Sequence, residues 1–241
     1  MLLLEALEDI TKLALSVAAL YVAVRLVLRR HQPEWSERIE RRRTAFVWLL
    51  SLGAAAIMVA EDALGGESRP IDRATLLFIR EWVPSALRQA FEWITLSASG
   101  RVLAPLTIAA SAALLLARRR IDAALVAASV ACAAAVVYVL KALVGRERPA
   151  LWEAQWYWGS SFPSGHTLAV AAFATAMALV AGREWPAARV PALTLALLWV
   201  VLVGFSRLVL GVHWPTDVLV AACLGAAIPL GLSFTFEPRR A

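Results

Sequence analysis

The chain of 241 residues has little of what soluble or disulfide-bonded proteins are built from. Charged residues make up only 17% of it, and it contains two cysteines, 12 glycines and 11 prolines. A soluble domain carries about 25% charged residues, and low-complexity chains need far more glycine and proline. Two cysteines cannot build a disulfide scaffold. The chain is instead 61% hydrophobic, which predicts an all-α, polytopic membrane helix bundle.

Seven apolar runs are long enough to cross a bilayer, which takes about 20 residues of helix. We expect spans at about 7–28, 44–59, 102–117, 121–144, 166–181, 190–210 and 215–234. Lys12 and Arg25 flank the first run, and if that run lies flat on the membrane, six spans remain. Its start is acidic and no small-residue cleavage site follows it, so we expect it to be retained rather than removed as a signal peptide.

Residues 71–96 are amphipathic rather than uniformly apolar. Apolar residues recur at helical spacing, and Asp72 is among the charged residues of the opposite, polar face. Pro84 should break or kink the helix. We expect one or two helices lying in the membrane interface, anchored by Trp82 and Trp93. The alternative is a capping helix that packs only on protein.

The basic residues predict the orientation of the spans. The net charge is +6, and alternating spans bring one group of arginines to the same membrane face. These are Arg29, Arg30, Arg38, Arg41, Arg42, Arg43, Arg118, Arg119, Arg120, Arg183, Arg189, Arg239 and Arg240. The positive-inside rule puts them in the cytoplasm, so we expect no nucleic-acid partner. The protein is then a multi-pass protein of the inner (cytoplasmic) membrane.

Three polar clusters interrupt the apolar pattern, all on the opposite face, which would be periplasmic or outside. The first ends the fourth span and contains Lys141 and Arg148, followed by Pro149. Seven residues are close to two helical turns, so both cations could share one helix face if the helix persists, although Pro149 disfavours helix at Arg148. They could clamp an anion there, or they could be snorkelling or topological charges.

The second cluster leads into the fifth span and contains Ser164, Gly165 and His166. Backbone N–H groups at such a helix start form an anion site, the Ser164 hydroxyl adds a donor, and His166 could give a proton to a bound group. An ordinary capped helix with an interfacial histidine is the alternative.

The third cluster joins the last two spans and contains Arg207, His213 and Asp217. Pro215 fits the first turn of a helix, so Asp217 just inside it can accept a hydrogen bond from one nitrogen of His213. The other nitrogen is then free to act as a nucleophile. A structural His–Asp pair is the alternative.

Taken together, three cations, a helix start and two histidines converge on one rim of the bundle. Phosphate is the target with the required concentrated negative charge, and the cations can neutralise it without a metal or cofactor. The two cysteines and three histidines show no zinc-ligand spacing.

The three motifs resemble the tripartite signature of the type 2 phosphatidic acid phosphatase superfamily. They read Lys141-x6-Arg148-Pro149, Pro163-Ser164-Gly165-His166 and Ser206-Arg207-x3-Gly211-x-His213-x3-Asp217. The resemblance implies a metal-independent phosphatase in which His213 attacks phosphorus, Asp217 orients it and His166 protonates the leaving oxygen. It also implies a set of phosphate-binding residues, namely Lys141, Arg148, Ser164, Gly165 and Arg207. The soluble vanadium haloperoxidases of the superfamily do not fit seven apolar spans.

The resemblance predicts a six-helix core over residues 44–234. We expect an extra span and basic loop (1–43), about which the resemblance says nothing, before this core and a cytoplasmic tail (235–241) after it. We expect a lipid phosphatase acting on a phospholipid or isoprenyl phosphate, such as undecaprenyl diphosphate, phosphatidylglycerol phosphate, phosphatidate or a lipid A phosphate. Trp152, Trp156, Tyr157 and Trp158 would form a belt near the headgroup, or merely pack their loop. A lipid phosphotransferase and a non-catalytic lipid-binding protein are the alternatives, and the sequence does not indicate an oligomeric state.

Overall fold

The computed structural model describes residues 2–152 and 159–236, which within these ranges form helices and no strand. The long helices are α1 (Leu2–His31), α3 (Arg43–Gly65), α6 (Gly100–Leu116), α7 (Arg120–Val144), α8 (Gly165–Glu184), α9 (Arg189–Val209) and α10 (Pro215–Thr235). The shorter ones are α2 (Pro33–Arg41), α4 (Arg69–Trp82) and α5 (Arg88–Leu96), with 3₁₀ turns at Ser85–Leu87 and Pro186–Ala188.

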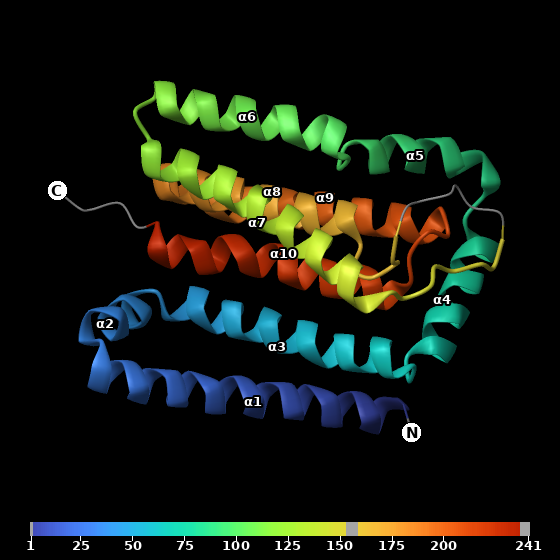
Figure 1. Cartoon of the computed structure of the whole chain (residues 1–241), viewed down its shortest axis with the longest axis horizontal. Coiled ribbons are helices and arrows are strands. Elements are labelled where there is room, and N and C mark those ends of the chain that lie inside the picture. Colours follow the sequence, from blue (N-terminus) through green and yellow to red (C-terminus); the bar gives the residue numbers. More distant parts are fainter. Residues whose placement is uncertain (1, 153–158, 237–241) are drawn as a thin grey trace.

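The predicted polytopic membrane bundle is confirmed. Seven helical stretches among the described residues are long and apolar enough to cross a membrane, each overlapping one expected span. The third differs most, because it covers Ser85–Leu116 and so includes α5 as well as α6. The first, Leu7–His31, is a continuous helix that contacts α3 (Figure 1), and it is long and apolar enough to be a span.

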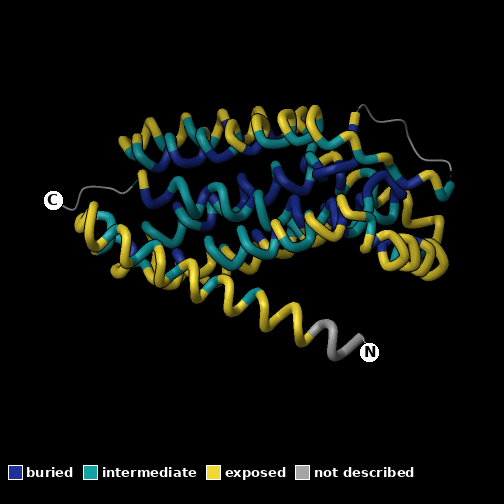
Figure 2. Tube along the Cα trace, turned by 60° about the horizontal axis from the view of Figure 1, so that its bottom comes forward, coloured by how far each residue is buried: buried dark blue, intermediate teal, exposed yellow. Residues whose placement is uncertain are grey.

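Helix α8 forms the centre of the bundle and contacts α6, α7, α9 and α10 (Figure 1). The tube in Figure 2 is dark along this centre and yellow along the peripheral helices. The sequence of α8 is rich in alanine, and small residues let membrane helices approach closely. Helices α8 and α10 approach closely at Gly225 of α10, where a Cβ atom would lie 2.5 Å from the Leu168 carbonyl oxygen.

The arginine-rich connections lie at one end of the bundle, as the alternation of spans predicts (Figure 1). There the side chains also cap helix ends. Arg38 donates to the Phe234 carbonyl (2.8 Å) and Arg42 to the Ser233 carbonyl (2.7 Å), both at the C-terminus of α10. Cations stabilise helix C-termini because they complement the dipole and satisfy the last carbonyls.

The amphipathic segment divides at Pro84, as predicted, into α4 and the 3₁₀ turn that leads to α5. Trp82 and Trp93 are exposed, so both are available as interfacial anchors. One expectation for this segment is wrong. Asp72 does not face outward with the other charged residues of its helix but is buried, with 1% of its surface exposed.

Candidate active site

The three predicted clusters meet at the end of the bundle opposite the arginine-rich connections. They come from the end of α7 and the stretch after it, from the start of α8, and from the turn between α9 and α10 (Figure 1). Segments that are 70 residues apart in the sequence are therefore in direct contact, as between Arg146 and Thr216.

Lys141 and Arg148 converge, but not along one helix face. Helix α7 ends at Val144, and Gly145 follows in the left-handed conformation with φ of 64°. The chain then turns, so that the Ser160 carbonyl accepts hydrogen bonds from both Lys141 Nζ and Arg148 Nη2. A second Arg148 nitrogen, Nη1, donates to the Val212 carbonyl at 2.8 Å. The two cations are thus joined through the loop after α7 and the turn before α10.

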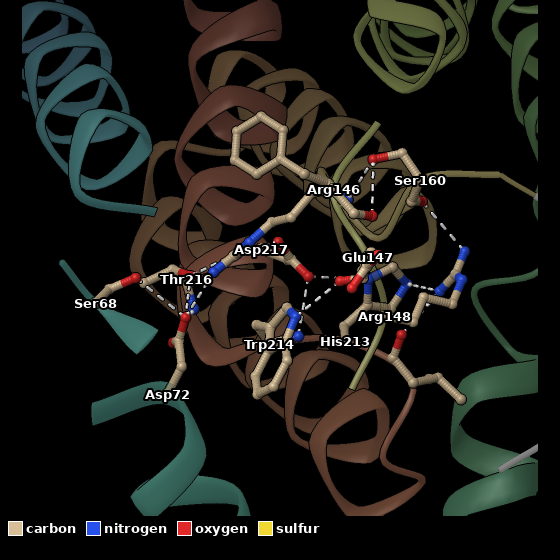
Figure 3. A network of polar contacts seen from close by, with 12 residues as sticks. Ser68, Asp72, Arg146, Glu147, Arg148, Ser160, His213, Trp214, Thr216 and Asp217 are labelled. Atoms are coloured by element: carbon tan, nitrogen blue, oxygen red, sulfur yellow. Dashed lines mark hydrogen bonds and ion pairs between the residues drawn. The ribbon is translucent and has the colours of Figure 1, made fainter. Parts of the chain in front are cut away.

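His213 lies between a carboxylate and a guanidinium. Its Nδ1 is 3.6 Å from Asp217 Oδ2, and its Nε2 is 3.4 Å from Arg148 Nη1 (Figure 3). The side chain is almost fully buried. Burial lowers the pKa of His213 to about 4, against the opposing effect of Asp217, so the imidazole is neutral at pH 7.

Asp217 occupies the third position of α10 and closes the turn that holds His213. Its Oδ2 accepts the backbone N–H of Trp214 at 2.9 Å, and its Oδ1 accepts a hydrogen bond from Arg146 Nη1 at 2.5 Å. The side chain has no exposed surface. The predicted His–Asp proximity is therefore present, although at 3.6 Å the two groups are in contact rather than hydrogen bonded.

Arg207 of α9 is completely buried, and its Nη1 donates to Thr95 Oγ1 of α5 at 2.6 Å. The turn that follows depends on Gly211, which has φ of 68°. A Cβ atom there would lie 2.4 Å from the ring of Trp152, so this tryptophan packs on the turn. The other members of the expected aromatic belt, Trp156, Tyr157 and Trp158, lie outside the described residues.

Ser164, Gly165 and His166 begin α8, as the sequence predicts. Ser164 is buried at the N-cap, where its hydroxyl lies 2.9 Å from Thr167 Oγ1 and its backbone N–H donates to the Asp217 carbonyl at 3.3 Å. The start of α8 is thereby held against the start of α10.

His166 also lines a pocket of about 850 Å³ between α5, α6 and the site. The other lining residues combine aromatic, apolar and polar side chains: Gln89, Glu92, Trp93, Thr95, Leu96, Ser99, Gly100, Arg101 and Leu210. His166 is thus partly open to this pocket, whereas the side chain of His213 is almost fully buried.

Sequence reasoning missed three polar residues that join this site. Asp72 of α4 accepts hydrogen bonds from Arg146 and Thr216, and Arg146 also contacts Asp217 (Figure 3). Arg146 lies between Lys141 and Arg148 in the sequence, but it occupies none of the motif positions. Among the described residues, no group of three His, Cys, Asp or Glu side chains could hold a metal ion.

The fold and this site define a class, an integral membrane helix bundle with a histidine–carboxylate–arginine cluster at one end. The family model of the PAP2 superfamily matches residues 122–240 of this chain, a range that includes all three motifs.

Two kinds of curated relative are similar in sequence. Phosphatidylglycerophosphatase B of Escherichia coli is 44% identical over 71 residues, which are 29% of this chain and 26% of that protein. The chain thus matches about a quarter of that relative's length. Decaprenylphosphoryl-5-phosphoribose phosphatase of Mycobacterium tuberculosis is 29% identical over 180 residues, which are 73% of this chain and 86% of that protein.

Two solved structures are similar in fold. The transmembrane PAP2-type phosphatidylglycerolphosphate phosphatase of Bacillus subtilis superimposes with a TM-score of 0.72 and 25% identity, over 80% of this chain and 98% of its own. LpxE of Aquifex aeolicus gives a TM-score of 0.53 at 24% identity, over 65% of this chain and 90% of its own.

Proposed function

We propose that the protein is an integral membrane lipid phosphatase that works through a phosphohistidine intermediate. The observation that carries the proposal is the setting of His213, with Nδ1 facing the Asp217 carboxylate and Nε2 facing the Arg148 guanidinium. Nε2 therefore points to the side on which an arginine would hold a phosphate. The phosphatases among its relatives support the same class of reaction.

In the first step, the lone pair of neutral His213 Nε2 attacks phosphorus. The N–P bond forms as the bond from phosphorus to the leaving oxygen breaks, and His166 gives its proton to that oxygen. Asp217 stabilises the positive charge that develops on the imidazole of His213.

In the second step, water hydrolyses the phosphohistidine. His166, now neutral, takes a proton from the attacking water while the N–P bond breaks, which releases inorganic phosphate and restores both histidines. Over the two steps His166 thus acts once as an acid and once as a base.

The phosphate oxygens would be held by Lys141, Arg148, Arg207, the Ser164 hydroxyl and the Gly165 N–H. Three cations neutralise the charge that spreads over the oxygens in the transition state. The N–H groups at the start of α8 add the positive end of a helix dipole. This set of groups predicts catalysis without a metal ion.

A lipid phosphate suits the position of the site at a bundle end, since the headgroup can enter while the tail stays in the bilayer. The pocket beside His166 would take the leaving group. Phosphatidylglycerol phosphate leads the candidates because two relatives carry that activity in their names. Phosphatidate, undecaprenyl diphosphate and lipid A phosphates complete the panel.

The test is a phosphate-release assay of the purified protein in detergent across this panel. We expect release from at least one lipid, persistence of activity in excess EDTA, and a loss of about 10³-fold or more in His213→Ala, which removes the nucleophile. Near wild-type turnover by folded His213→Ala would overturn the mechanism, and so would an EDTA loss that magnesium restores. Thin-layer analysis with an added acceptor lipid distinguishes a phosphotransferase from a hydrolase.

A further inference from the structure

Two buried carboxylates share one guanidinium beside the proposed nucleophile. Arg146 Nη2 donates to Asp72 Oδ2 at 2.9 Å, while Nη1 donates to Asp217 Oδ1 at 2.5 Å (Figure 3). The side chains of Asp72 and Asp217 are 1% and 0% exposed, and that of Arg146 is 11% exposed. Buried charges persist only when they are paired, so these three groups form one electrostatic unit.

Asp72 also fixes the start of α10. Its Oδ1 accepts the backbone N–H of Thr216 at 3.1 Å, and its Oδ2 accepts the Thr216 hydroxyl at 2.7 Å. The Ser68 hydroxyl donates to the same carboxylate at 3.2 Å. A carboxylate from α4 therefore caps the helix whose first turn directly follows His213, so the position of α4 is coupled to the position of His213.

Arg146 decides which oxygen of Asp217 faces the histidine. The planar fork of the guanidinium holds Oδ1 from one side, and this leaves Oδ2 directed at His213 Nδ1 and the Trp214 N–H. Without the guanidinium fork, the Asp217 carboxylate is free to rotate, and Oδ2 is then no longer held toward His213 Nδ1.

We propose that Asp72 and Arg146 are positioning residues of the active site, which hold the Asp217 carboxylate and through it the tautomer and orientation of His213. The inference rests on the proposed function, in which His213 is the nucleophile. Neither residue touches the phosphate in this scheme. Their contribution is to the rate of the chemical step rather than to substrate binding.

The charges around His213 predict in which direction its pKa changes in each variant. The charged and titratable groups that act on it are Asp217 on α10, Arg207 on α9, Arg148 after α7 and His166 on α8, and Lys141 on α7 acts on the neighbouring His166. Removing the Arg146 charge leaves two uncompensated carboxylates, which favours protonated His213 and raises its pKa. Removing the Asp72 charge has the opposite effect, because Arg146 then compensates Asp217 alone.

The experiment measures kcat, KM and the pH dependence of kcat/KM for Arg146→Gln, Asp72→Asn and the double variant, with the best lipid substrate of the panel. We expect kcat to fall about 10- to 100-fold in each single variant with KM changed less than threefold. The acid limb of the kcat/KM profile is the pH range in which His213 becomes protonated. It should move to higher pH in Arg146→Gln but not in Asp72→Asn. In the double variant it should return toward its wild-type position. The double variant should lose less than the product of the two single losses.

Two further variants separate positioning from folding. Arg146→Lys keeps the charge but lacks the planar fork that holds the two carboxylates in fixed orientations, so kcat should fall while the acid limb stays in place. Arg73→Gln removes a charge from an exposed position of α4, the helix that carries Asp72, and should leave kcat, KM and the pH profile unchanged.

The inference would be overturned if kcat were unchanged in Arg146→Gln and Asp72→Asn. It would also be overturned if kcat fell only in proportion to the folded fraction of each variant and the acid limb did not move. If Arg146→Gln does not fold, Asp72→Asn and Arg146→Lys decide the question by the same criteria. Failure of the proposed function is a separate result, because the wild-type protein would then release no phosphate.

Discussion

At the scale of single residues, the two proposed catalytic histidines differ in their surroundings. His213 is almost completely buried between Asp217 and Arg148, whereas His166 is partly exposed and lines the pocket of about 850 Å³. A buried nucleophile is kept neutral and oriented, and a proton donor must reach the leaving group. The difference in burial between the two side chains therefore supports the proposed roles of nucleophile for His213 and proton donor for His166.

His166 should matter most when the leaving group needs a proton. A lipid alcohol leaves poorly as an alkoxide, whereas a diphosphate expels a phosphate that is already stable as an anion. We expect His166→Ala to lower kcat about 10²- to 10⁴-fold on a phosphomonoester and clearly less on a diphosphate, measured as phosphate release from both lipids. His31→Ala, at an exposed position of α1, is the matched control and should leave both rates unchanged. Equal losses on the two substrates would contradict the assignment of His166 as the acid.

The sequence was sufficient to name the residues that meet at the site, but not those that support it. Short motifs report His166, His213 and Asp217 because each cluster is local in the chain. Asp72 and Arg146 lie 74 residues apart, and their pairing depends on how α4 docks. The polar face of an amphipathic helix has the same sequence pattern whether it meets water or a buried partner, so periodicity cannot detect such a contact.

At the scale of helices, hydropathy predicted the existence of each span better than its ends. Helices α7 and α10 begin and end within a residue or two of the expected bounds, because charged residues or a proline mark them. Helix α3 runs six residues past its expected end to Gly65, since Glu61 and Asp62 interrupt the apolar run but not the helix. Hydropathy indicates where the apolar run of residues ends. The helix itself ends where the backbone hydrogen bonds stop and a C-cap such as Gly66 follows.

The contact between α8 and α10 should be more sensitive to substitution than its composition suggests. A methyl group at Gly225 would meet the Leu168 carbonyl oxygen at 2.5 Å and Ala171 Cβ at 2.6 Å. Overpacking of this kind costs about 1–3 kcal/mol. We expect Gly225→Ala to lower the midpoint of thermal unfolding, measured by circular dichroism in detergent. It should also reduce phosphate release, because both helices begin at the site.

Gly53 provides the matched control for that substitution. It lies inside α3, and a Cβ atom there would have no neighbour within 4 Å. Gly53→Ala should therefore raise stability by about 0.5–1 kcal/mol, the usual gain from replacing glycine inside a helix. Equal midpoints for the two variants would show that α8 and α10 are not as closely packed as described.

At the scale of the whole molecule, the two ends of the bundle have different chemistry. One end collects arginines that hold Asp122 and the carbonyls at the end of α10, among them Arg119, Arg183, Arg38 and Arg42. The other end holds the histidines, the motif cations and the docked helix α4. The basic end satisfies the positive-inside rule, so the opposite end, with the site, should face the periplasm or the outside.

This sidedness can be measured with cysteines placed at exposed positions of the two ends. Cys132 and Cys223 are first replaced by alanine, because both are free thiols. Glu147→Cys then marks the site end and Arg41→Cys the basic end, both at exposed residues. In spheroplasts, a membrane-impermeant maleimide should label Glu147→Cys directly and Arg41→Cys only after lysis. The reverse pattern would place the site in the cytoplasm, and the arginines of the basic end would then serve as helix caps and ion pairs rather than as topological signals.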